Sequence, residues 1–248
     1  MKIIALIPAR YEAIRFPHKL MQMLGSKTVI RSTYDNTVAT GLFSQVYVVT
    51  DHEIIFNEIV NNGGKAVMSI AEHKSGSDRI AEAVHNLDAD IVINVQGDEP
   101  FVNREMLENL LSIFTEDKEK KIAVASPIKK IGDEASVLNP NIVKVVTDKE
   151  MNSLLFSRSP IPYQRDTTIT ALYYEHIGVY AFRKEALMKF SKWEMTSLEK
   201  AEKIECLRYL ENGVQLRMLE TVDPGIKIDV PADLIKAEKY LKELNILS

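Results

Sequence analysis

The chain has 248 residues and a formal net charge of −4, and 46% of its residues are hydrophobic and 27% charged. These values fit one large α/β domain or two small ones, and the acidic balance argues against a protein that binds nucleic acid through broad attraction to phosphates. The single cysteine, Cys206, excludes an internal disulfide and a cysteine-based metal cluster, and no hydrophobic run approaches the ~20 residues of a membrane-spanning helix. We therefore expect a cytoplasmic protein with neither nucleic acid nor membrane as a partner.

The first half of the chain predicts strands that alternate with helices. Hydrophobic runs bounded by Gly, Pro or polar residues favour strands, and hydrophobic residues at helical spacing favour helices. The predicted strands are residues 2–7, 45–50, 65–69 and 90–98, and the predicted helices are 27–39, 51–60, one capped by Ser77 and one capped by Asn103. Helix 27–39 is expected to carry Ile30, Tyr34 and Val38 on one face. This order of elements is typical of a mostly parallel sheet that helices cover on both faces.

The second half of the chain has strand-like segments whose connections are too short for crossover helices. These segments are residues 122–128, 143–147 and 154–158, and we expect them to form antiparallel hairpins. Such an insertion often lies over a ligand cleft or forms a dimer surface. The remaining predicted elements are a strand at 177–182, a helix near 197–211 and a closing helix from about Pro231. The expected fold class is α/β, with a mixed, mostly parallel sheet and an antiparallel hairpin insertion.

The run from Asp90 to Pro100 combines a short hydrophobic strand with a carboxylate at its C-terminal end. Gly97 permits a sharp turn, and Asp98 follows it directly. Ligands of open α/β sheets bind outside the carboxyl ends of the strands, and a carboxylate in that position is a natural oxygen ligand for Mg²⁺. Asp and Gly are also common in ordinary turns, so this run alone leaves the choice open.

A cluster of positive charges follows the first predicted strand. Arg10, Arg15 and Lys19 lie in a segment whose hydrophobic residues match neither helical nor strand spacing, which predicts a loop at the same sheet edge as Asp98. Arg offers a planar pair of donors to phosphate oxygens, and Lys offers a compact point charge. The alternative is a solvated basic loop. The clustering of cations within an acidic chain favours an anionic ligand that binds together with a divalent ion.

Two further segments carry candidate ligand-binding residues. The segment His73–Arg79 follows the third strand and opens a helix, which suits an anion or a ribose as well as an ordinary capping turn. Asp229 precedes a helix that starts near Pro231, and it is either a second metal ligand or a helix cap. The chain has no Gly-rich dinucleotide motif and no P-loop motif, so a dinucleotide oxidoreductase or a P-loop NTPase is not expected.

Other candidate residues carry little information individually. Glu199, Glu202 and Glu205 recur at three-residue spacing with lysines between them, which is typical of a solvated helix face. Arg158 and His176 lie at the ends of short predicted strands.

The segments that stand out occur in order along nearly the whole chain. They are Pro8-Ala9-Arg10 with Arg15 and Pro17-His18-Lys19, His73 to Arg79, Asn94 to Pro100, Asn139 to Val146, Phe156-Ser157-Arg158, His176 to Tyr180, Leu198 to Arg208, and Ile228 to Leu234. In this combination they resemble the family of 3-deoxy-manno-octulosonate (Kdo) cytidylyltransferases. The resemblance is far more specific than any single motif.

The resemblance implies a fold and a reaction. The fold would be three-layered, nucleotide-diphospho-sugar transferase-like and Rossmann-like, in a single cytidylyltransferase domain over residues 1–248, with a hairpin-rich part at approximately 120–180 for sugar binding and dimerisation. The enzyme would transfer CMP from CTP to the anomeric hydroxyl of Kdo and release pyrophosphate, giving CMP-Kdo for lipopolysaccharide biosynthesis. Its cofactor would be Mg²⁺ and its assembly a homodimer.

The resemblance also implies roles for residues of this sequence at positions that match the family's motifs. Those implied for CTP are Pro8, Ala9, Arg10, Arg15, Lys19, Ser75, Gly76 and Arg79. Those implied for Mg²⁺ are Asp98 and Asp229, which form the catalytic set together with Arg10, Arg15 and Lys19. Those implied for the sugar are Gln96, Arg158, His176, Tyr180, Glu202 and Glu205.

The sequence also departs from residues that are usual in the family. Ala13 and Ile14 replace hydroxyl residues, His18 replaces a Gly, Leu20 a Pro, Cys206 a Gln and Val230 a Thr. Two alternatives to a Kdo enzyme remain. One is a cytidylyltransferase for another 2-keto acid sugar, such as a sialic acid or an amino-Kdo. The other is a non-catalytic nucleotide- or sugar-binding protein, against which the presence of both Asp98 and Asp229 speaks.

Overall fold

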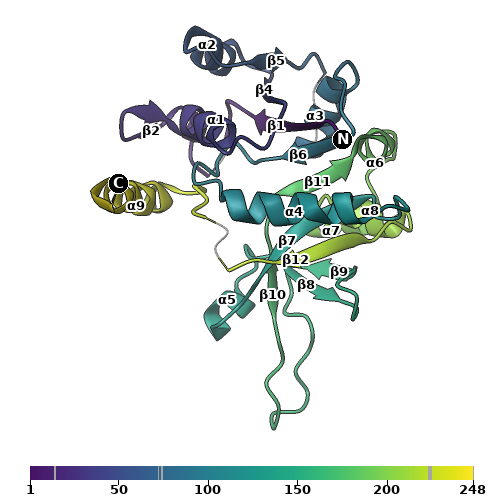
Figure 1. Cartoon of the computed structure of the whole chain (residues 1–248). Coiled ribbons are helices and arrows are strands. Elements are labelled where there is room, and N and C mark those ends of the chain that lie inside the picture. The colour runs from purple at the N-terminus through teal and green to yellow at the C-terminus, as the bar shows by residue number, and fades with distance from the viewer. Residues whose placement is uncertain (14, 72, 74, 223–224, 248) are drawn as a thin grey trace. The chain divides into compact units, whose positions relative to one another are not determined.

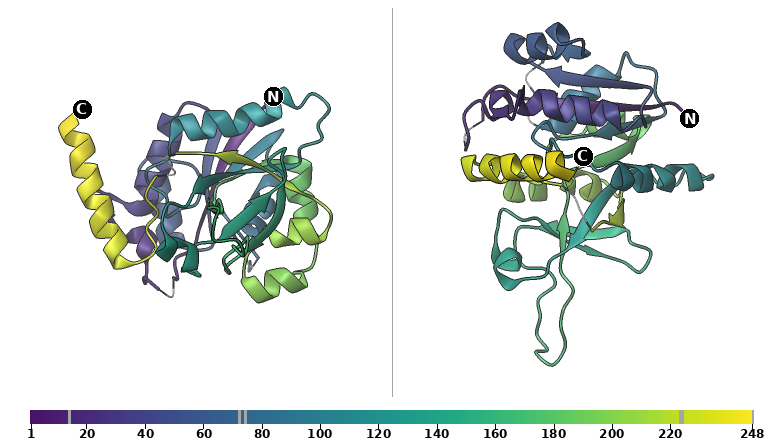
Figure 2. Two further views of the ribbon diagram at one scale, coloured as in Figure 1. Left: turned by 90° about the horizontal axis from the view of Figure 1, so that it is seen from below. Right: turned by 60° about the vertical axis from the view of Figure 1, so that its left-hand side comes forward.

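The computed structural model describes residues 1–13, 15–71, 73, 75–222 and 225–247, with side chains as far as residue 243. Ile14 and Lys74, which belong to segments discussed above, lie outside the described residues. The chain divides into two compact units. Unit 1 comprises Met1–Arg104 and Gly225–Ser248, and unit 2 comprises Glu105–Pro224. Figure 1 and Figure 2 show the elements of both units.

Unit 1 is built on a parallel sheet. Its strands lie in the order β5 (Ala66–Met68), β4 (Gln45–Thr50), β1 (Ile3–Ala9) and β6 (Ile91–Asn94). In β1, Ala5 lies between Val46 of β4 and Ile93 of β6. Residues 4–7 of this strand are at most 1% exposed, which is the burial expected of a strand covered on both faces. The prediction of a parallel sheet in this half of the chain is confirmed.

Helices and a small hairpin complete unit 1. They are η1 (Lys19–Met21, a short 3₁₀ turn), the hairpin of β2 (Met23–Leu24) and β3 (Lys27–Thr28), α1 (Val29–Ala39), α2 (Glu53–Asn61), α3 (Gly76–Val84) and α9 (Pro231–Leu247). Helices α1, α2 and α3 contact strands of the sheet. None of the described helices, in either unit, has the length and hydrophobicity that crossing a membrane requires.

One sequence prediction about these helices is wrong, and one expected helix face is only partly buried. Ser75, not Ser77, caps α3, because Ser75 has an extended backbone and its hydroxyl accepts a backbone N–H, whereas Ser77 is buried inside the first turn. The face expected to carry Ile30, Tyr34 and Val38 is not buried along its whole length, because Val38 is 47% exposed. The buried side of α1 instead includes Thr33 and Thr37, whose hydroxyls donate to backbone carbonyls of the preceding turn and so tolerate burial.

Unit 2 has a mixed sheet around β7 (Val124–Lys130). Strands β10 (Tyr174–His176) and β11 (Tyr180–Arg183) pair antiparallel with β7, and β12 (Leu216–Glu220) pairs parallel with it. Strand β8 (Lys144–Thr147) pairs antiparallel with β10 and with β9 (Ser153–Ser157). The expected hairpin of β8 and β9 is confirmed. A hairpin of β7 with β8 is not formed, because β10 lies between them and α5 (Glu134–Leu138) occupies their connection.

Besides α5, the described helices of unit 2 are α4 (Arg104–Glu116, whose first residue is still counted in unit 1), α6 (Lys184–Phe190), α7 (Ser197–Glu202) and α8 (Leu207–Glu211). The predicted helix near 197–211 is therefore two helices, because Lys203 adopts a left-handed backbone with φ 54° and ends α7. The expected solvated face is wrong for Glu199. Its side chain is buried and pairs with Arg208, with 2.6 Å between Glu199 Oε1 and Arg208 Nη2.

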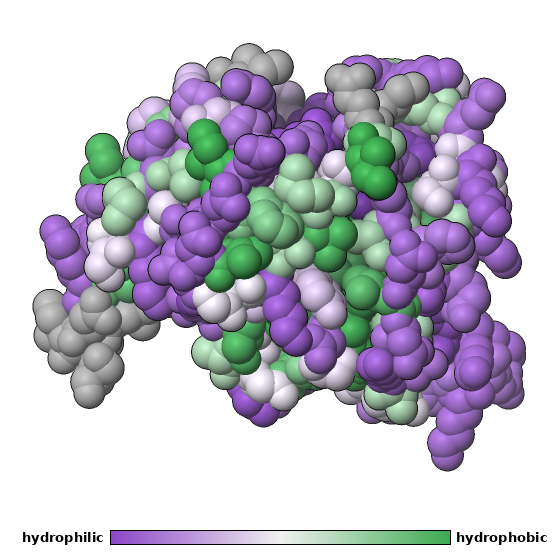
Figure 3. All heavy atoms as spheres, turned by 90° about the horizontal axis from the view of Figure 1, so that it is seen from above, coloured by the Kyte–Doolittle hydropathy of each residue, from purple (hydrophilic) through white to green (hydrophobic). Residues whose placement is uncertain are grey.

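Hydrophobic side chains also reach the surface. Figure 3 shows one face of the molecule mostly in the colours of hydrophilic residues, with hydrophobic residues in groups between them. In unit 2, the segment between β9 and β10 is a long loop in Figure 1. On this loop Tyr163 is 87% exposed, and Ile169 and Leu172 are each 62% exposed.

Candidate active site

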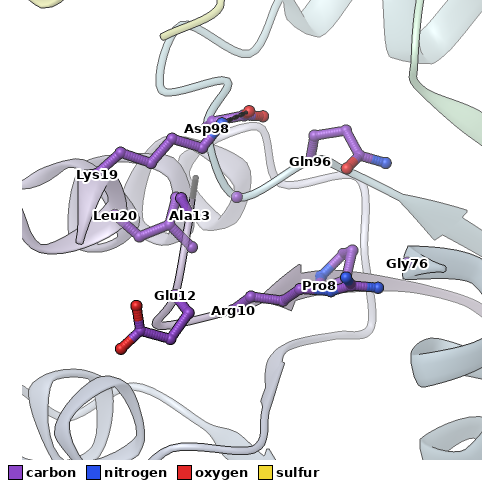
Figure 4. A pocket seen from close by; sticks show the side chains of 10 residues that line it. Pro8, Arg10, Glu12, Ala13, Lys19, Leu20, Gly76, Gln96 and Asp98 are labelled. Atoms are coloured by element: carbon purple, nitrogen blue, oxygen red, sulfur yellow. Dashed lines mark hydrogen bonds and ion pairs between the residues drawn. The ribbon is translucent and has the colours of Figure 1, made fainter. Parts of the chain in front are cut away.

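A pocket of about 280 Å³ lies in unit 1 at the carboxyl ends of β1 and β6. The two strands pair in parallel, so their C-terminal ends and the loops that follow meet at one edge of the sheet. The pocket is lined by Pro8, Arg10, Glu12, Ala13, Lys19, Leu20, Gly76, Gln96, Gly97 and Asp98 (Figure 4). Pro8, Arg10, Lys19, Gly76, Gln96 and Asp98 belong to the site residues that the resemblance implies.

The loops at this edge approach so closely that they leave little room for a Cβ atom at two glycines. A Cβ atom added at Gly97 would lie 3.0 Å from the carbonyl oxygen of Pro8 and 3.2 Å from Cδ1 of Ile30. A Cβ atom at Gly76 would lie 3.3 Å from Cγ of Pro8. The turn before Asp98 therefore packs directly against the end of β1, and this packing holds the Asp98 carboxylate beside the cationic loop.

Asp98 and Asp229 meet at Lys19. The ammonium nitrogen of Lys19 lies 2.5 Å from Asp98 Oδ2 and 3.1 Å from Asp229 Oδ1. Figure 4 draws the contact of Lys19 with Asp98 as a dashed line. Arg15 Nη2 lies 3.2 Å from Asp229 Oδ2. The structure thus brings the two carboxylates predicted as metal ligands together with two of the predicted cations.

The contacts at the start of α9 argue against the cap role that was considered for Asp229. The carboxylate of Asp233 accepts hydrogen bonds from the backbone N–H groups of Asp229 and Val230, each at 3.1 Å. Asp233 therefore caps the helix, although Val230 stands where the family usually has a capping Thr. The carboxylate of Asp229 is left to bind cations.

Two charged residues that the sequence patterns did not single out lie beside this cluster. Burial raises the pKa of Glu99 to about 8, against the attraction of Lys227 and with the support of Asp98 and Asp229. The charge of Asp98 raises the pKa of Lys227 against its desolvation. For Asp229, burial favours the neutral form, but Lys227 and Lys19 outweigh it and lower the pKa. The sequence offered one indication of Lys227, namely that it lies two residues before the candidate ligand Asp229.

The donor set fits a hard divalent cation such as Mg²⁺. Two carboxylate oxygens from different loops, those of Asp98 and Asp229, converge on one positive charge at Lys19. Hard cations bind carboxylate oxygens of this kind, together with phosphate oxygens and water. Among the described residues, no group of three or more His, Cys, Asp or Glu side chains is placed to hold a metal ion.

The predicted nucleoside segment, His73–Arg79, is anchored within unit 1. Arg10 Nη2 donates to the carbonyl oxygen of His73 at 3.1 Å, and Ser75 is the cap of α3. Arg79 is only 1% exposed, and its guanidinium donates to Ser69 Oγ at 2.7 Å and to Asp51 Oδ2 at 2.6 Å. Arg79 therefore connects α3 to Asp51, which follows β4, and to Ser69, which follows β5. From the interior of unit 1, the buried side chain of Arg79 supports the segment that contains Ser75 and Gly76.

A stack of three aromatic rings holds the cationic loop. The ring centroid of Tyr11 lies 4.0 Å from that of His52 and 4.3 Å from that of His18. His18 has a left-handed backbone with φ 52°, a conformation in which Gly is least strained, which agrees with Gly as the usual family residue. Because His52 precedes α2 and His18 precedes Lys19, the stack ties the loop to the end of β4.

Of the predicted sugar-binding residues, Arg158 and Glu202 lie together in unit 2. The carboxylate of Glu202 accepts hydrogen bonds from the hydroxyl of Ser157 at 2.7 Å and from the backbone N–H of Arg158 at 2.9 Å. These bonds, with Arg158 nearby, outweigh the desolvation of Glu202 and lower its pKa. The guanidinium of Arg158 in turn donates to the carbonyl oxygen of Glu202 at 2.6 Å.

A second group in unit 2 contains His176 and Tyr180. Nε2 of His176 lies 2.9 Å from Ser126 Oγ, and the His176 ring lies 5.3 Å from that of Tyr180 between centroids. Burial, with the charge of Glu205 and the neighbouring thiol of Cys206, raises the pKa of Tyr180 well above its usual value. Gln96, the remaining predicted sugar ligand, belongs to unit 1 and donates to Asn94 Oδ1 at 3.3 Å.

Known cytidylyltransferases match this chain over most of its length. A family model described as Cytidylyltransferase matches residues 4–220. The 3-deoxy-manno-octulosonate cytidylyltransferase of Flavobacterium johnsoniae is 57% identical over 244 residues, which cover 98% of this chain and 100% of the relative. The 3-deoxy-manno-octulosonate cytidylyltransferase of Geobacter metallireducens is 40% identical over 257 residues, which cover 99% of this chain and 100% of the relative.

Solved structures agree with these relatives. A CMP:2-keto-3-deoxy-manno-octonic acid synthetase complexed with CTP superposes with a TM-score of 0.92 and 35% identity, covering 98% of this chain and 99% of the other. A 4-diphosphocytidyl-2C-methyl-D-erythritol synthase from Anaerococcus prevotii, with a TM-score of 0.65 and 16% identity over 97% of this chain and 98% of the other, shares the fold. The predicted α/β nucleotidyltransferase fold is confirmed. The chain belongs to the 3-deoxy-manno-octulosonate cytidylyltransferase family.

Proposed function

We propose that the chain transfers CMP from CTP to the anomeric hydroxyl of 3-deoxy-D-manno-octulosonate and releases pyrophosphate. The observation that supports this most is the meeting of Asp98, Asp229 and Lys19 beside the pocket at the sheet edge. Carboxylates that suit a metal ion, next to a cationic loop, are the groups that a nucleoside triphosphate needs. The family relatives indicate cytidine as the base and Kdo as the acceptor.

The cationic loop binds the triphosphate in this proposal. Asp98 and Asp229 would hold Mg²⁺, which would neutralise phosphate charge and polarise the α-phosphate. Lys19 and Arg15 are paired with these carboxylates in the structure described here, and they bind phosphate oxygens when CTP is present. Positive charge then lies where negative charge develops on the leaving pyrophosphate. Positioning and charge neutralisation, rather than covalent chemistry, account for the rate.

The acid is bound by the predicted sugar residues. Arg158 supplies N–H donors for the carboxylate of the sugar, and Glu202 and Glu205 accept hydrogen bonds from its hydroxyls. A site built to bind hydroxyls discriminates strongly against substrates that lack them. His176, Tyr180 and Gln96 complete this set in the proposal.

The proposal also includes the assembly and the domain. Both units act in one cytidylyltransferase domain, to which residues 120–180 contribute sugar binding and dimerisation. The hydrophobic side chains exposed on the loop between β9 and β10 support a homodimer, because such side chains gain free energy when a partner covers them. The chain would act in the cytoplasm, as its single cysteine suggests.

The experiment that tests the function is a substrate grid. Pyrophosphate release is measured with each of four nucleoside triphosphates against Kdo, an amino-Kdo, a sialic acid and glucose 1-phosphate, and products are identified by mass spectrometry. We expect CMP-Kdo from CTP and Kdo, with much slower release for every other pair. A CDP-sugar formed from glucose 1-phosphate, with Kdo unchanged, would contradict the proposal, and a preference for another keto acid would correct the acceptor.

A further inference from the structure

Lys144 is a buried cation to which the proposed reaction gives no role. It opens β8, with Ser157 of β9 and Glu175 of β10 as its strand neighbours, and its side chain is fully buried. The ammonium donates to three backbone carbonyl oxygens, those of Asn139 at 3.0 Å, Ile142 at 2.7 Å and Arg158 at 2.6 Å. A lysine ammonium has three N–H donors, so each carbonyl takes one of them.

These carbonyls belong to the segments that hold Arg158. The carbonyl oxygen of Arg158 is bound by Lys144, and its backbone N–H is bound by Glu202. The guanidinium of Arg158 donates to the carbonyl oxygen of Pro140 at 2.8 Å. Pro140 lies between Asn139 and Ile142, whose carbonyls both accept from Lys144. One ammonium therefore fixes the main chain of Arg158 and also the loop that receives its side chain.

The same contacts set the plane of the guanidinium. Nε of Arg158 donates to the carbonyl oxygen of Glu202 at 2.6 Å, Nη1 to Pro140, and Nη2 to the carbonyl oxygen of Lys203 at 3.4 Å. These bonds use three of the five N–H groups of the guanidinium, which are arranged in a rigid fork. The guanidinium donates to neutral carbonyls, and the nearby carboxylate of Glu202 bonds to the backbone N–H of Arg158 instead. In these contacts the guanidinium is not bonded to a carboxylate of the protein, and a sugar carboxylate can take that place.

We propose that Lys144 is a positioning residue for the acid substrate, because it fixes Arg158 from its main chain and from the Asn139–Ile142 loop so that the guanidinium presents its donors to the sugar carboxylate. The inference rests on the proposed function and adds a residue to which no role had been given. A buried ammonium with backbone acceptors is costly to desolvate, and a role in orienting Arg158 explains why a cation stands at this position.

The experiment separates the two substrates kinetically. Lys144→Met keeps an unbranched side chain as far as the Cε position and removes the ammonium. We expect the KM for Kdo to rise about tenfold or more, the size of a misplaced charge-assisted hydrogen bond, while the KM for CTP changes less than about twofold. In an Arg158→Ala background, Lys144→Met should change the KM for Kdo no further, because its route to the substrate is gone.

A matched variant controls for general destabilisation. Arg183→Met removes another largely buried cation of unit 2, one that donates to the carbonyl oxygen of Ile122 at 2.9 Å and to Asp117 Oδ2 at 2.8 Å. It should lower the melting temperature and leave both KM values near those of the unmodified enzyme. If Lys144→Met does not fold, Lys144→Gln, which keeps N–H donors without the charge, should raise the KM for Kdo in the same direction.

The outcomes distinguish this inference from the proposed function. If the unmodified enzyme makes no CMP-Kdo, the proposed function fails. If it makes CMP-Kdo, the positioning role is overturned by a folded Lys144 variant with an unchanged KM for Kdo, by equal increases in the KM for Kdo and for CTP, or by effects of Lys144→Met and Arg158→Ala that simply add.

Discussion

At the scale of single residues, contacts separate side chains of one type into different roles. Asp229 and Asp233 lie four positions apart, yet Asp233 accepts two backbone N–H groups at the helix start, whereas Asp229 contacts Lys19 and Arg15. Asp98 reaches the same Lys19 from a turn whose tight packing depends on Gly97. The two carboxylates that share a cation are those that we propose as Mg²⁺ ligands, and the capping carboxylate is not one of them.

The first prediction concerns the two metal carboxylates. Asp98→Asn and Asp229→Asn keep the shape of the side chain and remove the charge that a divalent ion needs. Either variant should lower turnover by about two orders of magnitude or more, because charge neutralisation at the phosphates is lost. The measurement is pyrophosphate release from CTP and Kdo over a titration of Mg²⁺.

Asp233→Asn is the matched control for this prediction. It makes the same chemical change at the same helix start, and it should cost about 0.3–1 kcal/mol of stability through the lost negative charge at the helix N-terminus while turnover is kept. Near-normal turnover by Asp98→Asn or Asp229→Asn at saturating Mg²⁺ would show that the carboxylates do not hold the metal.

The second prediction concerns Arg15. Its side chain is 58% exposed, so its ion pair with Asp229 contributes about 0–1 kcal/mol to folding. A charge-assisted contact with a phosphate is worth about 1.5–3 kcal/mol, so Arg15→Ala should reduce kcat/KM for CTP by about tenfold to a hundredfold with little change in melting temperature. Steady-state kinetics with each substrate varied in turn measures this.

Lys27→Ala is the control, because Lys27 is an exposed cation of unit 1 that pairs with Asp35 at 2.8 Å. It should leave the kinetics unchanged. If Arg15→Ala raised only the KM for Kdo, the cationic loop would belong to the acid rather than to CTP.

At the scale of elements, the sequence predicted strands and helices that have a local hydrophobic pattern, and it missed those that depend on distant partners. Strand β4 has the predicted bounds, because the hydrophobic residues from Val46 to Val49 lie between the polar residues Gln45 and Thr50. Strand β12, at Leu216–Glu220, was not predicted, because it carries Arg217 and Glu220 and is stabilised by pairing with the distant β7. The break between α7 and α8 lies at Lys203, where no Gly or Pro marks the end of a helix.

The candidate site shows the same division. The place of Asp98 in the pocket could be predicted because Asp98 lies in the turn that follows the hydrophobic strand β6. The position of Asp229 before a helix left two roles open, and the contacts of Asp233 argue against the cap. The burial of Arg79 could not be predicted, because its partners Ser69 and Asp51 come from two other loops. Long-range pairs of this kind leave no periodicity in the sequence.

The third prediction concerns Asp117, which joins the end of α4 to the strand region of unit 2. Burial would raise its pKa, but Arg183 and the backbone N–H groups of Ile122 and Lys121 outweigh burial and lower it. A carboxyl whose pKa is lower in the folded state stabilises the fold above its unfolded pKa of about 4, and this stabilisation is lost as the pH falls through the folded pKa.

Asp117→Asn should therefore lower the free energy of unfolding by about 1–3 kcal/mol at pH 7. The difference from the unmodified protein should shrink as the pH falls below about 5. Urea unfolding at a series of pH values measures it. Glu119→Gln, which changes an exposed carboxylate paired with Lys121, should have little effect at any pH. A difference for Asp117→Asn that does not depend on pH would contradict the assignment of the stabilisation to its charge.

At the scale of the whole molecule, the two units differ in architecture and in the chemistry they carry. Unit 1 has a parallel sheet, with the pocket, the cationic loop and the two carboxylates proposed to bind Mg²⁺. Unit 2 has a largely antiparallel sheet and five of the six predicted sugar residues. The proposal therefore assigns phosphate binding to unit 1 and most of the acid recognition to unit 2, and on this basis we expect Lys144→Met to change the KM for CTP little.

The last prediction concerns assembly. The loop between β9 and β10 exposes Tyr163, Ile169 and Leu172, and hydrophobic side chains grouped on one loop favour burial against a second copy of the chain. Sedimentation equilibrium should give the mass of a dimer for the unmodified protein and of a monomer for the double variant Tyr163→Asp with Ile169→Asp. Ile235→Asp, at a position of unit 1 that is 68% exposed, makes the same change elsewhere and should leave the dimer intact. A dimer that persists in the double variant would place the interface on another surface, and a monomeric unmodified protein would refute the dimer itself.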